Sequence, residues 1–251
     1  MCIACDISDS LQEPSSTLRS SKRRSLLGFA GAASLAGMFS MGMAHANAPA
    51  KPENELKPDE AIARLMAGNE RYISGKTEAS DYAQTRKALS KSQNPYAGIL
   101  SCADSRISPE LCFDEERGDL FVTRVAGNFV NTDILASLEY GTAVLGASVI
   151  MVLGHTRCGA IDAAVQAYTK NVAYPGHIQT LTTALAPAVR EASKRATASE
   201  LVAASTLENV RQNVKRLQES NPIISARVAE GKLKIVGGLY ELTTGRVSMV
   251  S

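Results

Sequence analysis

The sequence predicts an α/β fold in which a central, mostly parallel β-sheet is flanked by helices. Short apolar runs of strand length alternate with longer stretches whose apolar residues recur every three or four positions, a pattern typical of parallel strands joined by helices. The run at residues 148–153 is apolar on both faces, which favours a sheet covered on both sides. With 251 residues, 45% of them hydrophobic, the chain can form one domain with its own core.

The first 46 residues have the organisation of a bacterial export signal. A basic stretch ends in Arg23-Arg24, an uncharged Gly/Ala-rich run follows at 26–43, and Ala44-His45-Ala46 supplies a small-x-small cleavage site. Paired arginines ahead of a mildly apolar run indicate a twin-arginine signal peptide, whose export machinery carries folded proteins to the periplasm or out of the cell. An uncleaved membrane anchor is the alternative, because the run approaches the length of a spanning helix.

The predicted organisation is a signal peptide over 1–46, a Pro-rich flexible linker over 47–57 and one domain over 58–251. Without residues 1–46 the chain keeps 23 basic and 22 acidic residues. This near-neutral balance gives no electrostatic basis for binding nucleic acid or a membrane surface, so we expect neither partner after cleavage. Three cysteines remain, and an odd number argues against a disulfide framework.

The elements of the domain follow from its apolar spacing. A helix is expected first, because Ile62, Leu65, Met66 and Asn69 recur at helical intervals, with Asp59 as its cap and a stop at Gly75. Strands are expected at 96–100, 120–125, 148–153 and 233–236, with a further edge strand at 247–250. Helices are expected between them at 132–145, 159–169, 177–196 and 199–219.

Two short motifs follow predicted strands and contain the candidate metal ligands. Cys102-Ala-Asp104-Ser-Arg106 comes after the first strand, and His155-Thr-Arg-Cys158-Gly159 comes after the third. Open α/β sheets place their sites at the carboxyl ends of strands. Cys102, His155 and Cys158 would give a zinc ion three ligands and leave one position open, which is the arrangement of catalytic zinc. Taken singly, each could be an ordinary buried cysteine or polar histidine.

The sequence CADSR followed by GHTRCGA resembles the paired signature of the β-class carbonic anhydrases. The resemblance extends over residues 58–250 and includes the GDLFVTR stretch at 118–124 and the GGLY stretch at 237–240. It implies a β-carbonic anhydrase fold, one Zn²⁺ per chain, and reversible hydration of carbon dioxide to bicarbonate and a proton by a zinc-bound hydroxide. The chemistry agrees, because zinc lowers the pKa of its water from about 15.7 to about 7.

The resemblance also assigns roles to residues around the metal. Asp104 would accept a hydrogen bond from the nucleophile, and Arg106 would hold that carboxylate ionised. The alternative for this pair is a surface salt bridge. The residues expected to bind substrate are Gln93, Phe121, Tyr140 and Gly159, of which Phe121 and Tyr140 are equally explained as core aromatics. Val125 and Ala126 depart from the commonest family pattern, which predicts a slightly wider pocket wall.

Two other functions remain open at this point. Relatives of the same fold hydrolyse carbonyl sulfide or carbon disulfide with the same ligands, and a non-catalytic zinc- or bicarbonate-binding domain would also explain three ligands. The resemblance further implies a homodimer or a higher homo-oligomer, with the N-terminal helix lying on the partner and the active site close to the interface. Cys112 is expected to be a packed apolar residue, and His177 an exposed residue at a helix start.

Overall fold

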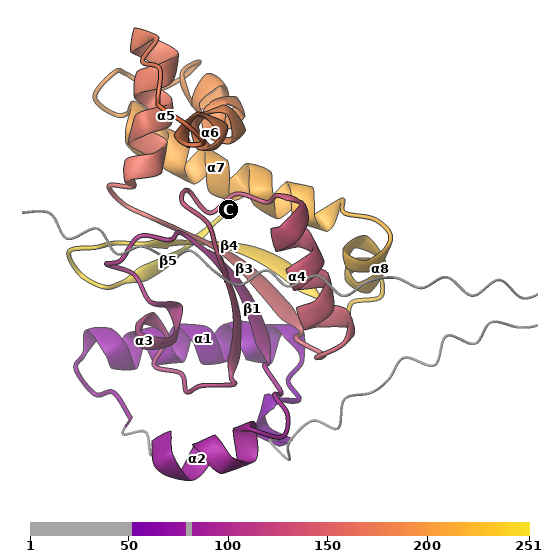
Figure 1. Ribbon diagram of the computed structural model, residues 1–251. Helices are drawn as coiled ribbons and strands as arrows, with labels where there is room; N and C mark the ends of the chain where they lie inside the picture. Colours follow the sequence, from indigo (N-terminus) through magenta and orange to yellow (C-terminus); the bar gives the residue numbers. More distant parts are fainter. Residues whose placement is uncertain (1–51, 79–81) are drawn as a thin grey trace, which may run out of the picture. The chain divides into compact units, whose positions relative to one another are not determined.

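A five-stranded sheet forms the centre of the molecule. The computed structural model describes residues 52–78 and 82–251, so the predicted signal peptide lies outside the described residues. Along the sheet the order is β2-β1-β3-β4-β5. The first four strands are parallel and β5 is antiparallel to β4, so the predicted fold class and edge strand are confirmed (Figure 1). The strands are β1 (Ala97–Ser101), β2 (Leu120–Arg124), β3 (Val149–His155), β4 (Lys234–Tyr240) and β5 (Val247–Val250).

Helices cover both faces of the sheet, as the apolar β3 sequence predicts. Because side chains alternate along a strand, Ile99 and Met151 pack on one side with α1 (Pro58–Ile73) and α3 (Pro109–Cys112). Leu100 and Val152 pack on the other side. The helices on that side are α4 (Thr132–Ala143), α7 (Leu201–Gln218) and α8 (Ile223–Ala229).

A third cluster lies beyond the carboxyl end of β3. It is formed by α5 (Gly159–Lys170), α6 (Ile178–Ala192) and the start of α7, and it includes Cys102 and Cys158. Figure 1 shows α5 and α6 stacked at the opposite end of the molecule from α1. The zinc-ligand candidates therefore lie between the sheet and this helical cluster. Two further elements are the 3-10 turn η1 (Pro52–Asn54) and α2 (Tyr82–Leu89).

Several expected boundaries are corrected by the structure. The linker is shorter than predicted, because Asn54 is buried and donates hydrogen bonds to Asn94 O at 2.7 Å and Asp119 Oδ1 at 2.8 Å. Helix α1 is capped at Lys57 rather than Asp59, since Pro58 occupies the first helical position and Glu60 reaches back to the Lys57 N–H. This helix packs on its own chain's sheet through Ala61 and Leu65.

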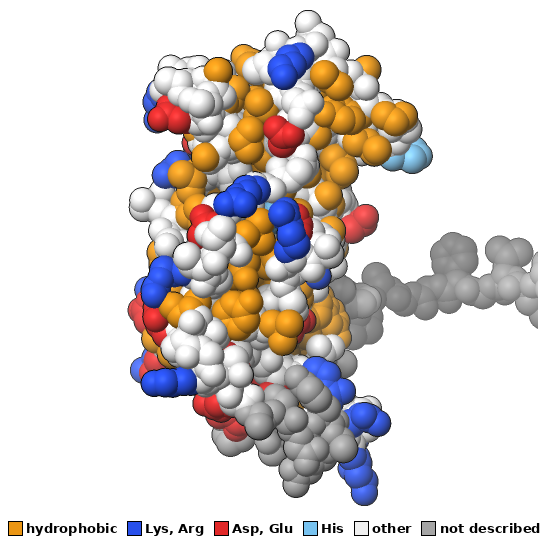
Figure 2. All heavy atoms as spheres, turned by 90° about the vertical axis from the view of Figure 1, so that its left-hand side faces the viewer, with side chains coloured by type: hydrophobic (Ala, Val, Ile, Leu, Met, Phe, Trp, Pro, Cys, Tyr) orange, Lys and Arg blue, Asp and Glu red, His pale blue; other side chains and the backbone are white. Residues whose placement is uncertain are grey.

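The surface of the described residues fits the near-neutral composition. Figure 2 shows basic and acidic side chains interspersed with hydrophobic ones over one face. Among residues 52–78 and 82–251, none of the helices combines the length and the apolar character that crossing a bilayer requires.

Candidate active site

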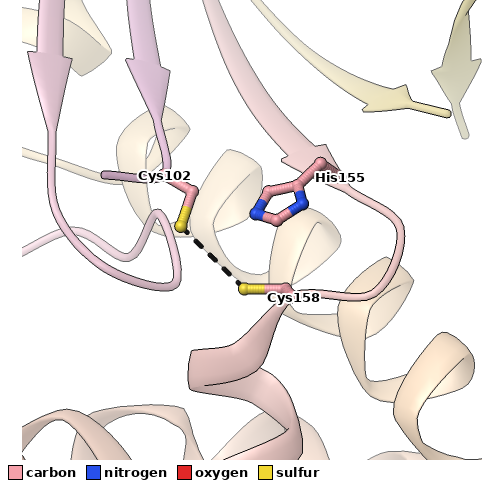
Figure 3. Close-up of side chains that lie close together, drawn as sticks. All are labelled: Cys102, His155 and Cys158. Carbon is pink, nitrogen blue, oxygen red and sulfur yellow. Dashed lines mark hydrogen bonds between the residues drawn. The ribbon is translucent and has the colours of Figure 1, made fainter. Parts of the chain in front are cut away.

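Cys102, His155 and Cys158 converge from three separate segments. Cys102 follows the last residue of β1, His155 is the last residue of β3, and Cys158 is the N-cap of α5. All three are buried, and their ligand atoms lie within 4.8 Å of one another. Figure 3 shows the three side chains pointing towards one another. The predicted ligand set is therefore a single cluster, with His155 inside the third strand rather than after it.

The parallel pairing of β1 and β3 brings the two motifs together. Ser101 lies opposite Leu153, so Cys102 emerges beside Gly154 and His155. The chain then turns sharply at Arg157, whose φ of 55° is left-handed, and this turn returns Cys158 to the cluster. The three-residue spacing of His155 and Cys158 is thus realised by a turn between a strand and a helix.

The cluster fits a tetrahedral zinc ion. Cys102 Sγ and Cys158 Sγ are 3.9 Å apart, and two sulfurs each about 2.3 Å from one zinc would be separated by about 3.8 Å. The distance is far from the ~2.05 Å of a disulfide. His155 Nδ1 lies 2.9 Å from Thr156 O, which favours a proton on Nδ1 and leaves the Nε2 lone pair available. His155 Nε2 is buried without a hydrogen-bond partner in the described part of the chain, as expected of a metal ligand.

The electrostatics also favour a cation at this position. The hydrogen bond with Cys158 lowers the pKa of Cys102 to about 4 despite burial, and the nearby His155 and the hydrogen bond from the Gly127 N–H add to this shift. The same hydrogen bond with Cys102 and burial raise the pKa of Cys158. For His155, burial lowers the pKa, but contact with Cys102 outweighs it and the net shift is upwards. A cation would replace the proton that these groups share.

Asp104 is held beside the ligands by Arg106. Arg106 Nε donates to Asp104 Oδ1 at 2.9 Å and Nη2 donates to Oδ2 at 2.7 Å, while the Arg106 N–H donates to Oδ1 at 3.0 Å. The Arg106 side-chain hydrogen bonds hold the pKa of Asp104 well below its usual range. Asp104 Oδ2 lies 3.8 Å from His155 Nε2, and only 16% of the Asp104 side chain is exposed. The geometry favours a site carboxylate over a surface salt bridge.

Gly159 lies at the start of α5, directly after Cys158. The first N–H groups of a helix have no partner within the helix, and a Cβ added at Gly159 would meet no atom within 4 Å. There is thus open space on the side of this glycine where a side chain would lie. This is the position expected of a backbone donor to a substrate oxygen.

Two residues that sequence reasoning did not select shape the site. Arg124, at the end of β2, donates to three backbone oxygens of the Cys102 loop: Cys102 O at 2.9 Å, Asp104 O at 2.7 Å and Ile107 O at 2.9 Å. The Gly127 N–H donates to Cys102 Sγ at 3.2 Å. A basic residue at the carboxyl end of a strand next to β1 is the signal that could have identified Arg124.

The other predicted pocket residues are not beside the ligands of their own chain. Phe121 pairs with Gly98, four residues before Cys102, which places it roughly 13 Å back along the sheet. Its ring lies 6.2 Å from the ring of Tyr140, centroid to centroid. Gln93 is exposed and, with Tyr140, lines an open hollow of about 720 Å³ to which none of the ligands contributes. Within one chain, these three residues therefore do not line the space beside the metal ligands.

Cys112 and His177 occupy the positions that the sequence predicts. Cys112 is buried against α1, and burial raises the pKa of its thiol to about 12. His177 is exposed and immediately precedes α6.

Comparison with known proteins matches both the sequence and the fold. The family model described as carbonic anhydrase matches residues 97–247. The chain is 36% identical to carbonic anhydrase 2 of Mycobacterium tuberculosis, over 75% of this chain and 91% of that protein. It is 32% identical to a carbonic anhydrase of Mycolicibacterium smegmatis, over 77% of this chain and 94% of that protein.

Solved structures agree. The β-carbonic anhydrase CcaA matches with a TM-score of 0.61 and 27% identity, over 76% of this chain and 87% of that chain. The β-carbonic anhydrase of Coccomyxa, solved with acetazolamide, matches with a TM-score of 0.57 and 27% identity, over 76% and 82%. A tetrameric β-carbonic anhydrase of Sordaria macrospora shares the fold, with a TM-score of 0.61 and 24% identity over 76% and 98%. Together with the cysteine and histidine cluster at the ends of β1 and β3, these matches show that the chain belongs to the β-carbonic anhydrase family.

Proposed function

We propose that this chain is an exported zinc carbonic anhydrase that interconverts carbon dioxide and bicarbonate. The observation that carries the proposal is the convergence of Cys102, His155 and Cys158 beside an Asp104 carboxylate that is itself held by Arg106. Three protein ligands and one open position are the coordination of catalytic zinc. One zinc ion per chain, when bound, supplies Lewis-acid activation of water at neutral pH.

The chain's own residues would orient the reactants. Asp104 Oδ2 accepts one hydrogen bond from Arg106 Nη2, and the same oxygen is 3.8 Å from His155 Nε2. A remaining lone pair of Oδ2 can therefore accept a hydrogen bond from the attacking oxygen atom and hold it in one orientation. The N–H of Gly159 would bind the oxygen on which negative charge develops. Because the pKa of Asp104 is lowered, this carboxylate stays an acceptor throughout the neutral range.

A second copy of the chain is proposed to complete the substrate pocket. Gln93, Phe121 and Tyr140 are far from the ligands in one chain, yet they gather at the exposed side of the edge strand β2 and helix α4. Tyr140 of α4 and Val144, the C-cap residue one turn later, are 46% and 41% exposed, which is typical of an interface. A homodimer joined here would bring these residues to the partner's ligands, and the pair could assemble into a larger homo-oligomer.

Export through the twin-arginine machinery to the periplasm or beyond is proposed from the sequence at 1–46. N-terminal sequencing of the exported protein should find cleavage after Ala46, leaving a protein without stable membrane association. Replacing Arg23 and Arg24 with lysine should retain the precursor in the cytoplasm. An exported protein that keeps Met1 would contradict the cleavage.

The test of the activity is stopped-flow carbon dioxide hydration paired with zinc quantitation on the purified mature protein. We expect one zinc per chain and rapid hydration. Cys158→Ser should lose both zinc and activity, because a hydroxyl replaces one thiolate ligand. Cys112→Ala is the matched control, since Cys112 is equally buried but lies on the α1 side of the sheet. Wild-type protein that binds zinc but does not hydrate carbon dioxide would overturn the proposal, and assays with carbonyl sulfide and carbon disulfide would then identify a hydrolase.

A further inference from the structure

Helix α7 has two asparagines on its buried face, where apolar residues are usual. Asn209 and Asn213 are 3% and 6% exposed and lie one turn apart. Asparagine is a poor helix former, and a buried amide is costly unless it is hydrogen-bonded. Both are bonded to each other, with Asn213 Nδ2 donating to Asn209 Oδ1 at 3.0 Å. The remaining amide groups of the pair are therefore available to form hydrogen bonds with a segment outside the helix.

The asparagines hold the loop that follows β2. Asn209 Nδ2 donates to Gly127 O at 2.9 Å, and the Val130 N–H donates to Asn213 Oδ1 at 2.7 Å. They thus fix two points of the segment 127–130. Asn209 and Gly127 are 82 positions apart in the sequence, so this contact depends on the complete fold.

The held loop contains a β-turn whose central N–H points at a zinc ligand. The Asn128 N–H donates to Val125 O at 2.9 Å, and Gly127, the third residue of the turn, has a φ of 84°. This φ is that of a type II turn, which favours glycine at that position. The central peptide of a type II turn is flipped relative to type I, and here its N–H, that of Gly127, donates to Cys102 Sγ at 3.2 Å. A type I turn at the same place would direct the N–H away from the sulfur.

We propose that Asn209 and Asn213 are positioning residues for the zinc ligand Cys102, acting through the turn at 125–128. They hold the turn in the form that donates the Gly127 N–H to the Cys102 sulfur. A hydrogen bond to a metal thiolate fixes its direction and withdraws part of its charge, and such outer contacts strengthen metal binding. The inference rests on the zinc site of the proposed function.

The test compares two near-isosteric substitutions on the same buried face of α7. Asn209→Leu removes the donor to Gly127 O. Thr206→Val is the matched control, because Thr206 is 4% exposed and its hydroxyl bonds to Val202 O of the same helix at 2.8 Å. Zinc-loaded proteins are mixed with an excess of a coloured zinc chelator, and the transfer rate is followed by absorbance. Cobalt-loaded samples give the thiolate-to-metal charge-transfer band as a second readout, and thermal unfolding reports general destabilisation.

We expect Asn209→Leu to lose zinc at least about 10-fold faster than the wild type and to shift the charge-transfer band, while Thr206→Val changes neither. Wild-type rates and an unshifted band in Asn209→Leu would overturn the inference. Equal acceleration in Thr206→Val would overturn it too, by showing a general effect of helix destabilisation. If Asn209→Leu does not fold, Asn209→Ser, whose side chain is too short to reach Gly127 O, takes its place. Wild-type protein that binds no zinc would contradict the proposed function itself.

Discussion

The Cys102 thiol has neighbours that its place in the sequence does not reveal. It lies 3.9 Å from Cys158 Sγ and accepts a hydrogen bond from Gly127, and these contacts lower its pKa to about 4. Cys112, in the same chain, accepts only a long hydrogen bond from Asn69 Nδ2 at 3.8 Å, and burial outweighs it and raises the pKa of Cys112 to about 12. The difference between a metal ligand and a packing residue is therefore created by the surroundings.

Asp104 gives a prediction at the scale of one residue. Asp104→Asn should bind zinc normally but lower kcat/KM for carbon dioxide about 100-fold or more, because an amide cannot replace the carboxylate that orients the nucleophile. The mutant's pH profile should keep the wild-type shape between pH 6 and 9. Arg106 lowers the pKa of Asp104, so the Asp104 carboxylate stays ionised throughout this range. The stability that the Asp104–Arg106 pair contributes is lost only as the pH falls below the ordinary aspartate pKa of about 3.9. Wild-type turnover in stopped-flow assays would refute the role.

At the scale of elements, the strands and the long helices were predictable, and the short helices were not. The strands and the helices α1, α4, α5, α6 and α7 follow from apolar spacing. Helix α3 has four residues and no such period. It exists because Phe113 and Cys112 are buried against α1, which is information from tertiary packing. Helix α8 likewise packs into the core through Ile224, and neither α2 nor α8 was predicted from the sequence.

The contact between α1 and α3 gives a prediction about stability. A Cβ at Gly68 of α1 would lie 1.7 Å from Phe113 O, a backbone atom that has little freedom to move. Gly68→Ala should therefore lower the free energy of unfolding by about 2 kcal/mol, although alanine is the better helix former. The exposed neighbour Ala67 provides the control, since Ala67→Gly should cost only about 1 kcal/mol through helix propensity. Urea denaturation measures the free energy of unfolding of both variants. A Gly68→Ala protein that is more stable than the wild type would show that α1 can move away from Phe113 O without loss of stability.

The candidate site was predictable only as far as its motifs extend. The sequence identified the residues that follow strand ends, because functional side chains of an open α/β sheet lie at the carboxyl ends of its strands. These residues are Cys102, Asp104, Arg106, His155 and Cys158. The hydrogen bonds of Arg124, Gly127 and Asn209 involve backbone atoms. Every residue type has these backbone atoms, so the sequence does not show where such bonds form. The motifs also do not show which chain supplies Gln93, Phe121 and Tyr140, because that depends on how two copies meet.

At the scale of the whole molecule, the proposed dimer gives a prediction. It distinguishes an active site built from one chain from an active site to which both chains contribute residues. Cys158→Ser removes a ligand, and Gln93→Ala removes a residue of the hollow lined by Tyr140. Each variant alone should have little activity. Unfolded, mixed in equal amounts and refolded with zinc, they should recover about a quarter of wild-type activity, because half of the dimers are mixed and each mixed dimer has one complete site.

The control for the mixing experiment is each variant refolded alone, with sedimentation used to verify that dimers form. No recovery in verified mixed dimers would mean that Gln93 serves the ligands of its own chain. The pocket would then have to form by movement within one subunit.

The position of the ligands has a consequence for how the protein is made. Cys102 and His155 are 53 positions apart, and only the pairing of β1 with β3 brings them together. No local fragment of the chain contains the site, so metal is captured only by a chain whose central strands are already in register. The amount of bound metal therefore reports the fraction of chains whose sheet has folded. A cell that releases this enzyme only after zinc is bound would also be releasing only finished molecules.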